Sequence, residues 1–430
     1  MSTEKTAEFE IFSRRESQVR SYCESFPTRF AKAKGSIMID DKGREYIDFL
    51  AGCSSLNYGH NDPDMQAALI EHIQADGVTH GLDMYTDTKA QFLEAFEDII
   101  LKPRDMDHKV MMTGPTGTNA VEAAMKLARK VTGRRNIIAF TNGFHGMTLG
   151  ALACTGNAGK RAGASGGPLC GTSRMPFEGA FGDDVDTLKQ IELMLDNPSS
   201  GIDAPAAFIV EPVQGEGGLN AASAEWLKGI ADLAKKHGAL LIVDDIQAGC
   251  GRTGTFFSTE GMGFQPDMIT LAKSFSGMGL PFAALLVKPE LDIWKPAEHN
   301  GTFRGNTHAF VTAKTAIYKF WSDDKFQQEL AHKTVMITTA LNEIAELIPG
   351  AYLKGRGLMQ GVDVGSGELA EQICARAYEK GLVVETSGSD DEVVKILAPL
   401  TTSMETFRKG FNILLDATRD TLARTKIAAE

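Results

Sequence analysis

Two charged side chains, Lys273 and Asp244, each stand at the end of a short apolar run. Asp244 closes the run Ala239-Leu-Leu-Ile-Val-Asp244, and Lys273 follows Met268-Ile-Thr-Leu-Ala272. A lysine amine can form a Schiff base with an aldehyde, and a carboxylate can keep a pyridine nitrogen protonated, so that the ring accepts electrons from a carbanion. The pair therefore suits pyridoxal phosphate, although either residue alone could be a surface charge at the end of a strand.

A turn rich in glycine and threonine, residues 113–122, joins an expected strand to an expected helix. Such a turn exposes backbone N–H groups at the positive end of the helix dipole, which suits a phosphate dianion. Gly117 and Thr118 are the candidate phosphate ligands. Thr118 or Asn119 could instead cap the helix, with Glu122 in its first turn.

Two further loops follow expected strands. The loop at residues 141–146 carries Phe144, whose ring can stack on a heteroaromatic cofactor, and His145. Both could equally be structural core residues. Glu211 and Glu216 lie at a strand end and in the glycine-rich loop after it, where open α/β sheets bind ligands, although turn-forming acids would look the same.

The composition is that of a globular protein: 430 residues, 43% hydrophobic and 23% charged. The net charge of −12 argues against a nucleic-acid groove. The chain begins without a basic segment and apolar core, and no apolar run approaches the length of a membrane span, so we expect neither a secretory signal nor a membrane anchor. The six cysteines lack CxxC or CxxH spacing, so we expect no metal site, no disulfide framework and a reducing cytoplasm.

The elements that must position these side chains alternate between strand and helix from about residue 60 to 325. Helical periodicity is clear in residues 223–237 and 309–321, and this alternation predicts an α/β fold with a mostly parallel sheet. The expected strands of the sheet are 109–112, 136–140, 207–210, 239–243, 268–271 and 282–287.

The two ends of the chain differ from this pattern. A hairpin is expected at residues 36–49, and helices near 332–348, 368–380 and from 404 alternate with a strand at 357–364. We therefore predict three segments: 1–59 and 326–430 form a small α+β domain, and 60–325 form the large domain.

Six motifs, in order along the chain, resemble the class III (omega) aminotransferases among the fold-type I pyridoxal phosphate enzymes. That resemblance implies a large domain with a mainly parallel seven-stranded sheet and a small domain built from both chain ends. The motifs are Gly117-Thr118, Phe144-His145-Gly146, Glu211-Pro-Val-Gln-Gly-Glu216, Asp244-Asp-Ile-Gln-Ala-Gly-Cys-Gly-Arg-Thr-Gly254, Leu271-Ala-Lys273 and Gly301-Thr-Phe-Arg-Gly-Asn306.

The resemblance implies roles for the residues that match these motifs. Lys273 would bind the cofactor covalently, Asp244 would contact the pyridine nitrogen, Gln247 would bond the ring hydroxyl and Phe144 would stack on the ring.

The phosphate would be held by Gly117 and Thr118, with Thr302 reaching it from the neighbouring subunit. This arrangement implies a homodimer or a multiple of one. His145 and Glu211 complete the expected cofactor pocket.

Longer matches, at residues 12–23, 48–60, 80–85 and 398–400, resemble members of the family that use small-molecule substrates, glutamate as amino donor and aspartate 4-semialdehyde as acceptor, in ectoine biosynthesis. In many relatives an arginine at the position of Lys395 pairs with the acid at the position of Glu216. We therefore expect Lys395 to make the pair with Glu216 in the substrate site, although a lysine lacks the planar fork of an arginine.

Other activities remain open on the residues alone. They are transamination of another omega-amine (ornithine, acetylornithine or 4-aminobutyrate), a pyridoxal-phosphate-dependent aminomutase or decarboxylase, and a noncatalytic regulator built on the same fold.

Overall fold

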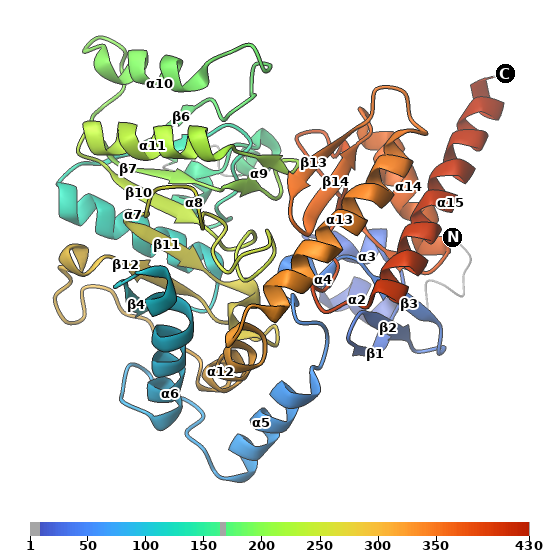
Figure 1. The fold of residues 1–430 in the computed structure, drawn as a ribbon, viewed down its shortest axis with the longest axis horizontal. Coiled ribbons are helices and arrows are strands. Elements are labelled where there is room, and N and C mark those ends of the chain that lie inside the picture. Colours follow the sequence, from blue (N-terminus) through green and yellow to red (C-terminus); the bar gives the residue numbers. More distant parts are fainter. Residues whose placement is uncertain (1–8, 164–168, 430) are drawn as a thin grey trace.

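A seven-stranded sheet forms the centre of the large lobe in the computed structural model, which describes residues 9–163 and 169–429 (Figure 1). β12 runs antiparallel to both of its neighbours, and the remaining pairs in the sheet are parallel. The predicted fold class is therefore confirmed. In spatial order the strands are β4 (Lys109–Met112), β12 (Ala284–Val287), β11 (Met268–Leu271), β10 (Leu240–Asp244), β7 (Pro205–Val210), β5 (Asn136–Phe140) and β6 (Thr172–Met175).

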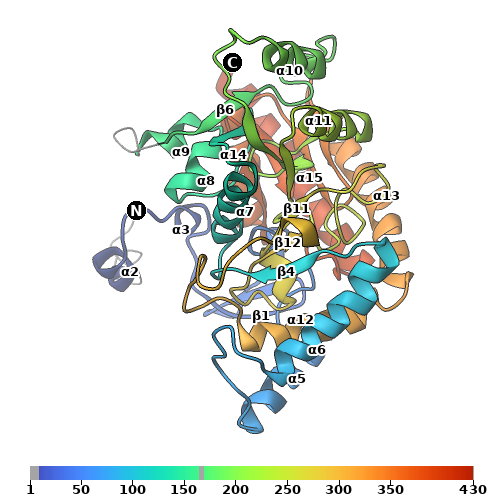
Figure 2. The ribbon, with the colours of Figure 1, turned by 90° about the vertical axis from the view of Figure 1, so that its left-hand side faces the viewer.

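Helices cover both faces of this sheet because successive strand residues point to opposite sides. Ile209 of β7 packs in the cluster that contains the alanine-rich face of α7 (Gly117–Thr132). Its neighbour Phe208 packs in the cluster formed by α11 (Ala224–Lys236). Figure 2 shows α7 and α11 beside the strands of the large lobe.

The smaller lobe joins the two ends of the chain. The N-terminal strands β1 (Phe30–Lys34), β2 (Ile37–Asp40) and β3 (Glu45–Asp48) form one sheet with β15 (Leu382–Val383), which pairs with β3 in parallel. This pairing agrees with a small domain built from both ends; the boundaries at residues 59/60 and 325/326 stay predictions. A second sheet has the order β13 (Tyr352–Arg356), β14 (Met359–Asp363), β17 (Val393–Ile396) and β16 (Glu385–Ser387).

The predicted strand at residues 357–364 is wrong at its start. Gly357 has a φ of 65°, in the left-handed region, and lies in the tight turn between β13 and β14. A side chain there would collide with the Thr253 backbone, so only glycine fits the turn. β6 was not predicted, because Thr172, Ser173 and Arg174 are polar and Met175 alone does not make the apolar pattern of a buried strand.

Helices complete both lobes, and no helix in the described ranges is long and apolar enough to cross a bilayer. Those of the large lobe are α5 (Pro63–Gln74), α6 (Asp87–Ala95), α8 (Leu149–Cys154), α9 (Ala158–Ala162), α10 (Thr187–Asp196) and α12 (Thr307–Trp321). Those nearer the chain ends are α2 (Glu10–Arg15), α3 (Tyr22–Ser25), α4 (Ala51–Ser54), α13 (Lys325–Ala345), α14 (Gly367–Glu379) and α15 (Met404–Ala429).

The two lobes are tied together by Arg252, which is fully buried. Its guanidinium donates to Asn57 Oδ1 (2.6 Å), Ser54 Oγ (2.9 Å) and the Ala398 carbonyl (2.7 Å). One side chain thus joins the N-terminal segment, the loop after β10 and the C-terminal segment beneath the site described next.

Candidate active site

A cavity of about 370 Å³ lies at the carboxyl ends of the central strands. Asp244 ends β10, Lys273 follows β11 and Glu211 follows β7, so the topology brings all three to one edge of the sheet. The other predicted site residues that line the cavity are Gly117, Thr118, Phe144, His145, Glu216 and Gln247.

Asp244 is held on both carboxylate oxygens. Its Oδ2 lies 2.6 Å from His145 Nδ1, and its Oδ1 accepts from the Thr270 hydroxyl at 3.0 Å. Burial lowers the pKa of His145, but the hydrogen bond and the charge of Asp244 outweigh it and leave that pKa raised. His145 therefore orients Asp244 from behind. Thr270 was not predicted as a site residue, because the sequence shows only a single threonine within an apolar strand.

Lys273 has a backbone conformation that side chains rarely adopt, with a φ of 51°. Such a conformation typically costs about 1–3 kcal/mol and persists where the surroundings impose it. The adjacent Ser274 hydroxyl donates to the Ser54 carbonyl at 2.7 Å and accepts from the Asn57 N–H at 2.8 Å. Burial lowers the pKa of Lys273. The lowered pKa raises the fraction of the neutral amine, which is the nucleophilic and basic form.

The N-terminus of α7 opens into the cavity at Gly117 and Thr118. Thr116 is the N-cap, and Asn119 Oδ1 accepts from the Thr116 N–H (3.3 Å) and hydroxyl (2.8 Å). The alternative that Thr118 or Asn119 is the N-cap, with Glu122 in the first turn, is therefore wrong: Asn119 is the third helical residue and its side chain reaches back to the N-cap Thr116. Thr118 instead lies 2.6 Å from the Thr148 hydroxyl, which leaves the first turn of the helix suited to a phosphate.

Phe144 is fixed on the cavity wall by Glu211, whose Oε2 accepts from the Phe144 N–H at 2.8 Å. Burial raises the pKa of Glu211 to about 7, against the lowering effect of His145. In this structure the carboxylate positions the aromatic loop. Its predicted contact with a cofactor stays a prediction.

Gln247 lines the cavity and has one unsatisfied acceptor. Its Nε2 donates to Glu216 Oε1 (3.2 Å) and to the Cys53 carbonyl (3.3 Å), whereas its buried Oε1 has no hydrogen-bond partner. A hydroxyl on a bound ring would satisfy that oxygen. With the aromatic wall, the amine, the carboxylate and the helix N-terminus, the residues present fit pyridoxal phosphate.

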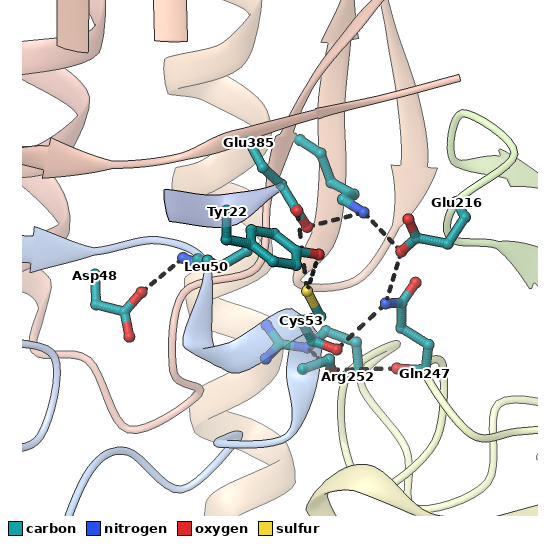
Figure 3. A network of polar contacts seen from close by, with 10 residues as sticks. Tyr22, Asp48, Leu50, Cys53, Glu216, Gln247, Arg252 and Glu385 are labelled. Atoms are coloured by element: carbon teal, nitrogen blue, oxygen red, sulfur yellow. Dashed lines mark hydrogen bonds and ion pairs between the residues drawn. The ribbon is translucent and has the colours of Figure 1, made fainter. Parts of the chain in front are cut away.

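Behind Glu216, which lines the cavity, lie one lysine and a second acid that do not line it themselves. Lys395 is fully buried, and its Nζ lies 3.1 Å from Glu216 Oε1 and 3.0 Å from Glu385 Oε1. Glu216 and Glu385 approach from opposite sides (Figure 3). Burial by itself lowers the pKa of Lys395, but the two carboxylates have the larger effect, so the pKa is raised. Lys395 in turn lowers the pKa of Glu216 to about 2.

The predicted pairing of Lys395 with Glu216 is therefore present. The contact of Lys395 with Glu385 was not predicted. β16 and β17 place Glu385 directly opposite Lys395, a cross-strand relation that cannot be recognised before the register is known.

Tyr22 and Cys53 lie beside these acids (Figure 3). The Tyr22 hydroxyl is 2.8 Å from Cys53 Sγ, and the thiol lies 3.9 Å from Glu385 Oε2. Burial raises the pKa of Cys53 to about 11, and burial with the charge of Glu385 raises that of Tyr22. Both groups are therefore neutral near pH 7.

Two predicted site residues, Lys395 and Thr302, do not line the cavity of their own chain. Lys395 lies behind Glu216. Thr302 is the predicted phosphate ligand. It lies on the exposed segment before α12, next to Phe303, whose side chain is 65% exposed. Within the described residues there is also no group of three or more His, Cys, Asp or Glu side chains arranged to hold a metal ion.

The model of the family Aminotransferase class-III matches residues 20–418, which is most of the chain. The protein belongs to the class III aminotransferases, and the predicted enzyme class is confirmed. Among its relatives, a diaminobutyrate–2-oxoglutarate transaminase from Halomonas elongata is 52% identical over 95% of this chain and 98% of that protein. Another protein of the same name, from Bordetella parapertussis, is 52% identical over 98% of both chains.

Solved structures agree with the fold. An ornithine aminotransferase from Toxoplasma gondii, described with partial occupancy of pyridoxal phosphate at its active site, superposes with a TM-score of 0.85 at 26% identity, over 98% of this chain and 96% of that one. An S-selective transaminase from an Arthrobacter species gives 0.83 at 23% identity, over 96% and 97% of the two chains.

Proposed function

We propose that the protein transfers the amino group of L-glutamate to the aldehyde carbon of L-aspartate 4-semialdehyde, giving 2-oxoglutarate and L-2,4-diaminobutyrate. The cofactor is pyridoxal phosphate. The observation that carries the proposal is a class III aminotransferase site whose substrate side bears the Glu216–Lys395 pair. The half-identical relatives named diaminobutyrate–2-oxoglutarate transaminase, which match nearly end to end, support the choice of substrates.

Each side chain at the cofactor has a separate task. When bound, pyridoxal phosphate supplies an electron sink that makes the C–H bond beside the reacting nitrogen acidic. Asp244 keeps a proton on the ring nitrogen, and His145 holds the carboxylate in place. Lys273, with its lowered pKa, anchors the cofactor and, once released, removes and returns the proton at the reacting carbon.

The two amino donors differ at the reacting carbon, where glutamate carries a carboxylate and diaminobutyrate carries only hydrogen. Lys395 meets that carboxylate when glutamate is bound, and Glu216 turns aside to release it. With diaminobutyrate bound, the 3.1 Å pair between Lys395 and Glu216 is retained. A charge pair that opens for one substrate thus lets one pocket accept both.

The active unit is a homodimer in this proposal, with Thr302 contacting the phosphate bound by the second copy. Residue His80 packs on Phe303 at a ring-centroid distance of 5.2 Å, so the segments around both residues form one surface. That surface is apolar and exposed, as expected of an interface between copies. Its large exposed apolar side chains are Val78, Leu82, Met84, Tyr85 and Phe303.

The cellular setting is the cytoplasm, where the reaction opens ectoine biosynthesis and so contributes to osmoprotection. The partners are small-molecule substrates and a second copy of the chain.

A coupled assay tests the reaction. Glutamate and aspartate 4-semialdehyde should yield diaminobutyrate and 2-oxoglutarate in equal amounts, with much lower rates for ornithine, acetylornithine and 4-aminobutyrate. A preference for one of these three amines would reassign the substrate. Product formation without consumption of an amino donor would indicate an aminomutase instead.

A further inference from the structure

Glu385 is a buried carboxylate that the transamination described above does not use. It lies on β16, opposite Lys395 of β17, and its Oε1 is 3.0 Å from the Lys395 ammonium. That contact does not have hydrogen-bond geometry, and Oε1 has no hydrogen-bond partner. Lys395 instead donates a hydrogen bond to Glu216 at 3.1 Å.

The charges around Glu385 do not balance. Glu216 and Glu385 bring two carboxylates to the single ammonium of Lys395. The neighbouring Tyr22 hydroxyl and Cys53 thiol are neutral near pH 7 because their pKa values are raised. Lys273 also acts on both carboxylates through its charge, but it forms no ion pair with Glu385. One buried carboxylate therefore lacks a directly paired counter-charge, which is unfavourable unless a further cation or a proton is bound.

The diamino substrate brings such a cation. In diaminobutyrate and aspartate 4-semialdehyde, C2 carries an ammonium group three bonds from the reacting C4. In an extended chain, three bonds span about 3.8 Å. Glutamate has no nitrogen at the corresponding position. Diaminobutyrate and aspartate 4-semialdehyde thus share a cationic group at a position where glutamate has none.

We infer that Glu385 binds the C2 ammonium of the diamino substrate and so selects it over amines that lack this group. The inference rests on the proposed function. With Glu216 paired to Lys395, as it is for the diamino substrate, the buried Oε1 of Glu385 keeps its 3.0 Å ion pair with Lys395 but accepts no hydrogen bond. The side chain lies one ion-pair contact beyond Glu216, which itself lines the cavity.

The test compares diaminobutyrate with 4-aminobutyrate, which has the same C4 amine and C1 carboxylate but no C2 ammonium. In the holoenzyme, Glu385→Gln should lower kcat/KM for the diaminobutyrate half-reaction at least about thirtyfold, mainly through KM. The rates with 4-aminobutyrate and with glutamate should stay within about threefold of the parent. Glu385→Asp should retain part of the preference, and Glu371→Gln, at an exposed acid of α14, should retain all of it.

Equal losses with diaminobutyrate and 4-aminobutyrate would overturn the inference. A comparable loss with glutamate would do the same, since it would show that Glu385 only positions Lys395. A parent enzyme that does not react with diaminobutyrate would instead refute the proposed function itself, and the inference with it.

Discussion

Replacing Lys395 by methionine tests the charge pair at the centre of the site. Methionine has a similar length and removes the only ammonium between Glu216 and Glu385. Removing one partner of a buried ion pair typically costs about 3–5 kcal/mol, because the other charge stays buried. Without Lys395, burial dominates at the two acids, their pKa values rise, and protonation near neutral pH offsets part of that cost.

The catalytic effect should be unequal. Glutamate and 2-oxoglutarate lose the cation that meets their carboxylate, a loss of about 2 kcal/mol or more that corresponds to at least about thirtyfold in kcat/KM. Diaminobutyrate makes no such contact, and its C2 ammonium would take the place of the missing cation beside Glu385 and keep that carboxylate ionised. Its half-reaction should therefore change by no more than about threefold. Single-turnover absorbance measurements of each half-reaction give the two values separately.

Lys333→Met is a matched control. Lys333 is also a buried lysine, whose Nζ lies 2.6 Å from Glu329 and 2.5 Å from the Leu400 carbonyl. Neither of these partners lines the cavity, whereas Glu216, the partner of Lys395, does. This variant should melt at a lower temperature and keep the ratio of the two half-reactions. Equal losses in both half-reactions of Lys395→Met would refute the proposed pair opening, whatever the size of the loss.

Four further outcomes are expected. Lys273→Ala should abolish turnover while still binding cofactor; after borohydride reduction, mass spectrometry should find the cofactor mass on the parent chain only, and retained turnover would contradict the assignment. Asp244→Asn should bind cofactor but lose several orders of magnitude in rate, since an amide does not hold a proton on the ring nitrogen; near-normal turnover would exclude that role. Thr302→Val should weaken cofactor binding by the assembled protein, and cofactor removal should lower both the melting temperature and the dimer fraction; a monomer that binds cofactor equally well would disprove the shared site. Burial raises the pKa of Asp245 from 3.8 to about 7. Between these two pH values the folded protein holds a proton that the unfolded chain has lost. The free energy of unfolding therefore falls as the pH rises through this range. Asp245→Asn should therefore gain stability relative to the parent at pH 8 but not at pH 4, and an unchanged difference in melting temperature across this range would contradict the raised pKa.

Local patterns were sufficient for six of the seven strands in the sheet of the large lobe. A buried parallel strand requires a short apolar run and a covering helix requires an apolar stripe, so β4, β5, β10 and β11 could be located within a residue or two. β6 escaped because an edge strand with polar residues has no such pattern. The turn at Gly357 escaped because a lone glycine does not reveal the backbone that approaches it.

The chemistry of the cofactor side was determined by the sequence itself, because Asp244 ends a strand and Lys273 and Glu211 each lie just after one. Parallel strands bring their carboxyl ends to one edge of the sheet. The substrate side was decided only by the tertiary structure. Glu385 meets Lys395 through the register of β16 and β17, and Glu216 reaches the same ammonium from a loop of the other lobe. Such contacts depend on strand register and on lobe packing, and neither leaves a periodic signal along the chain.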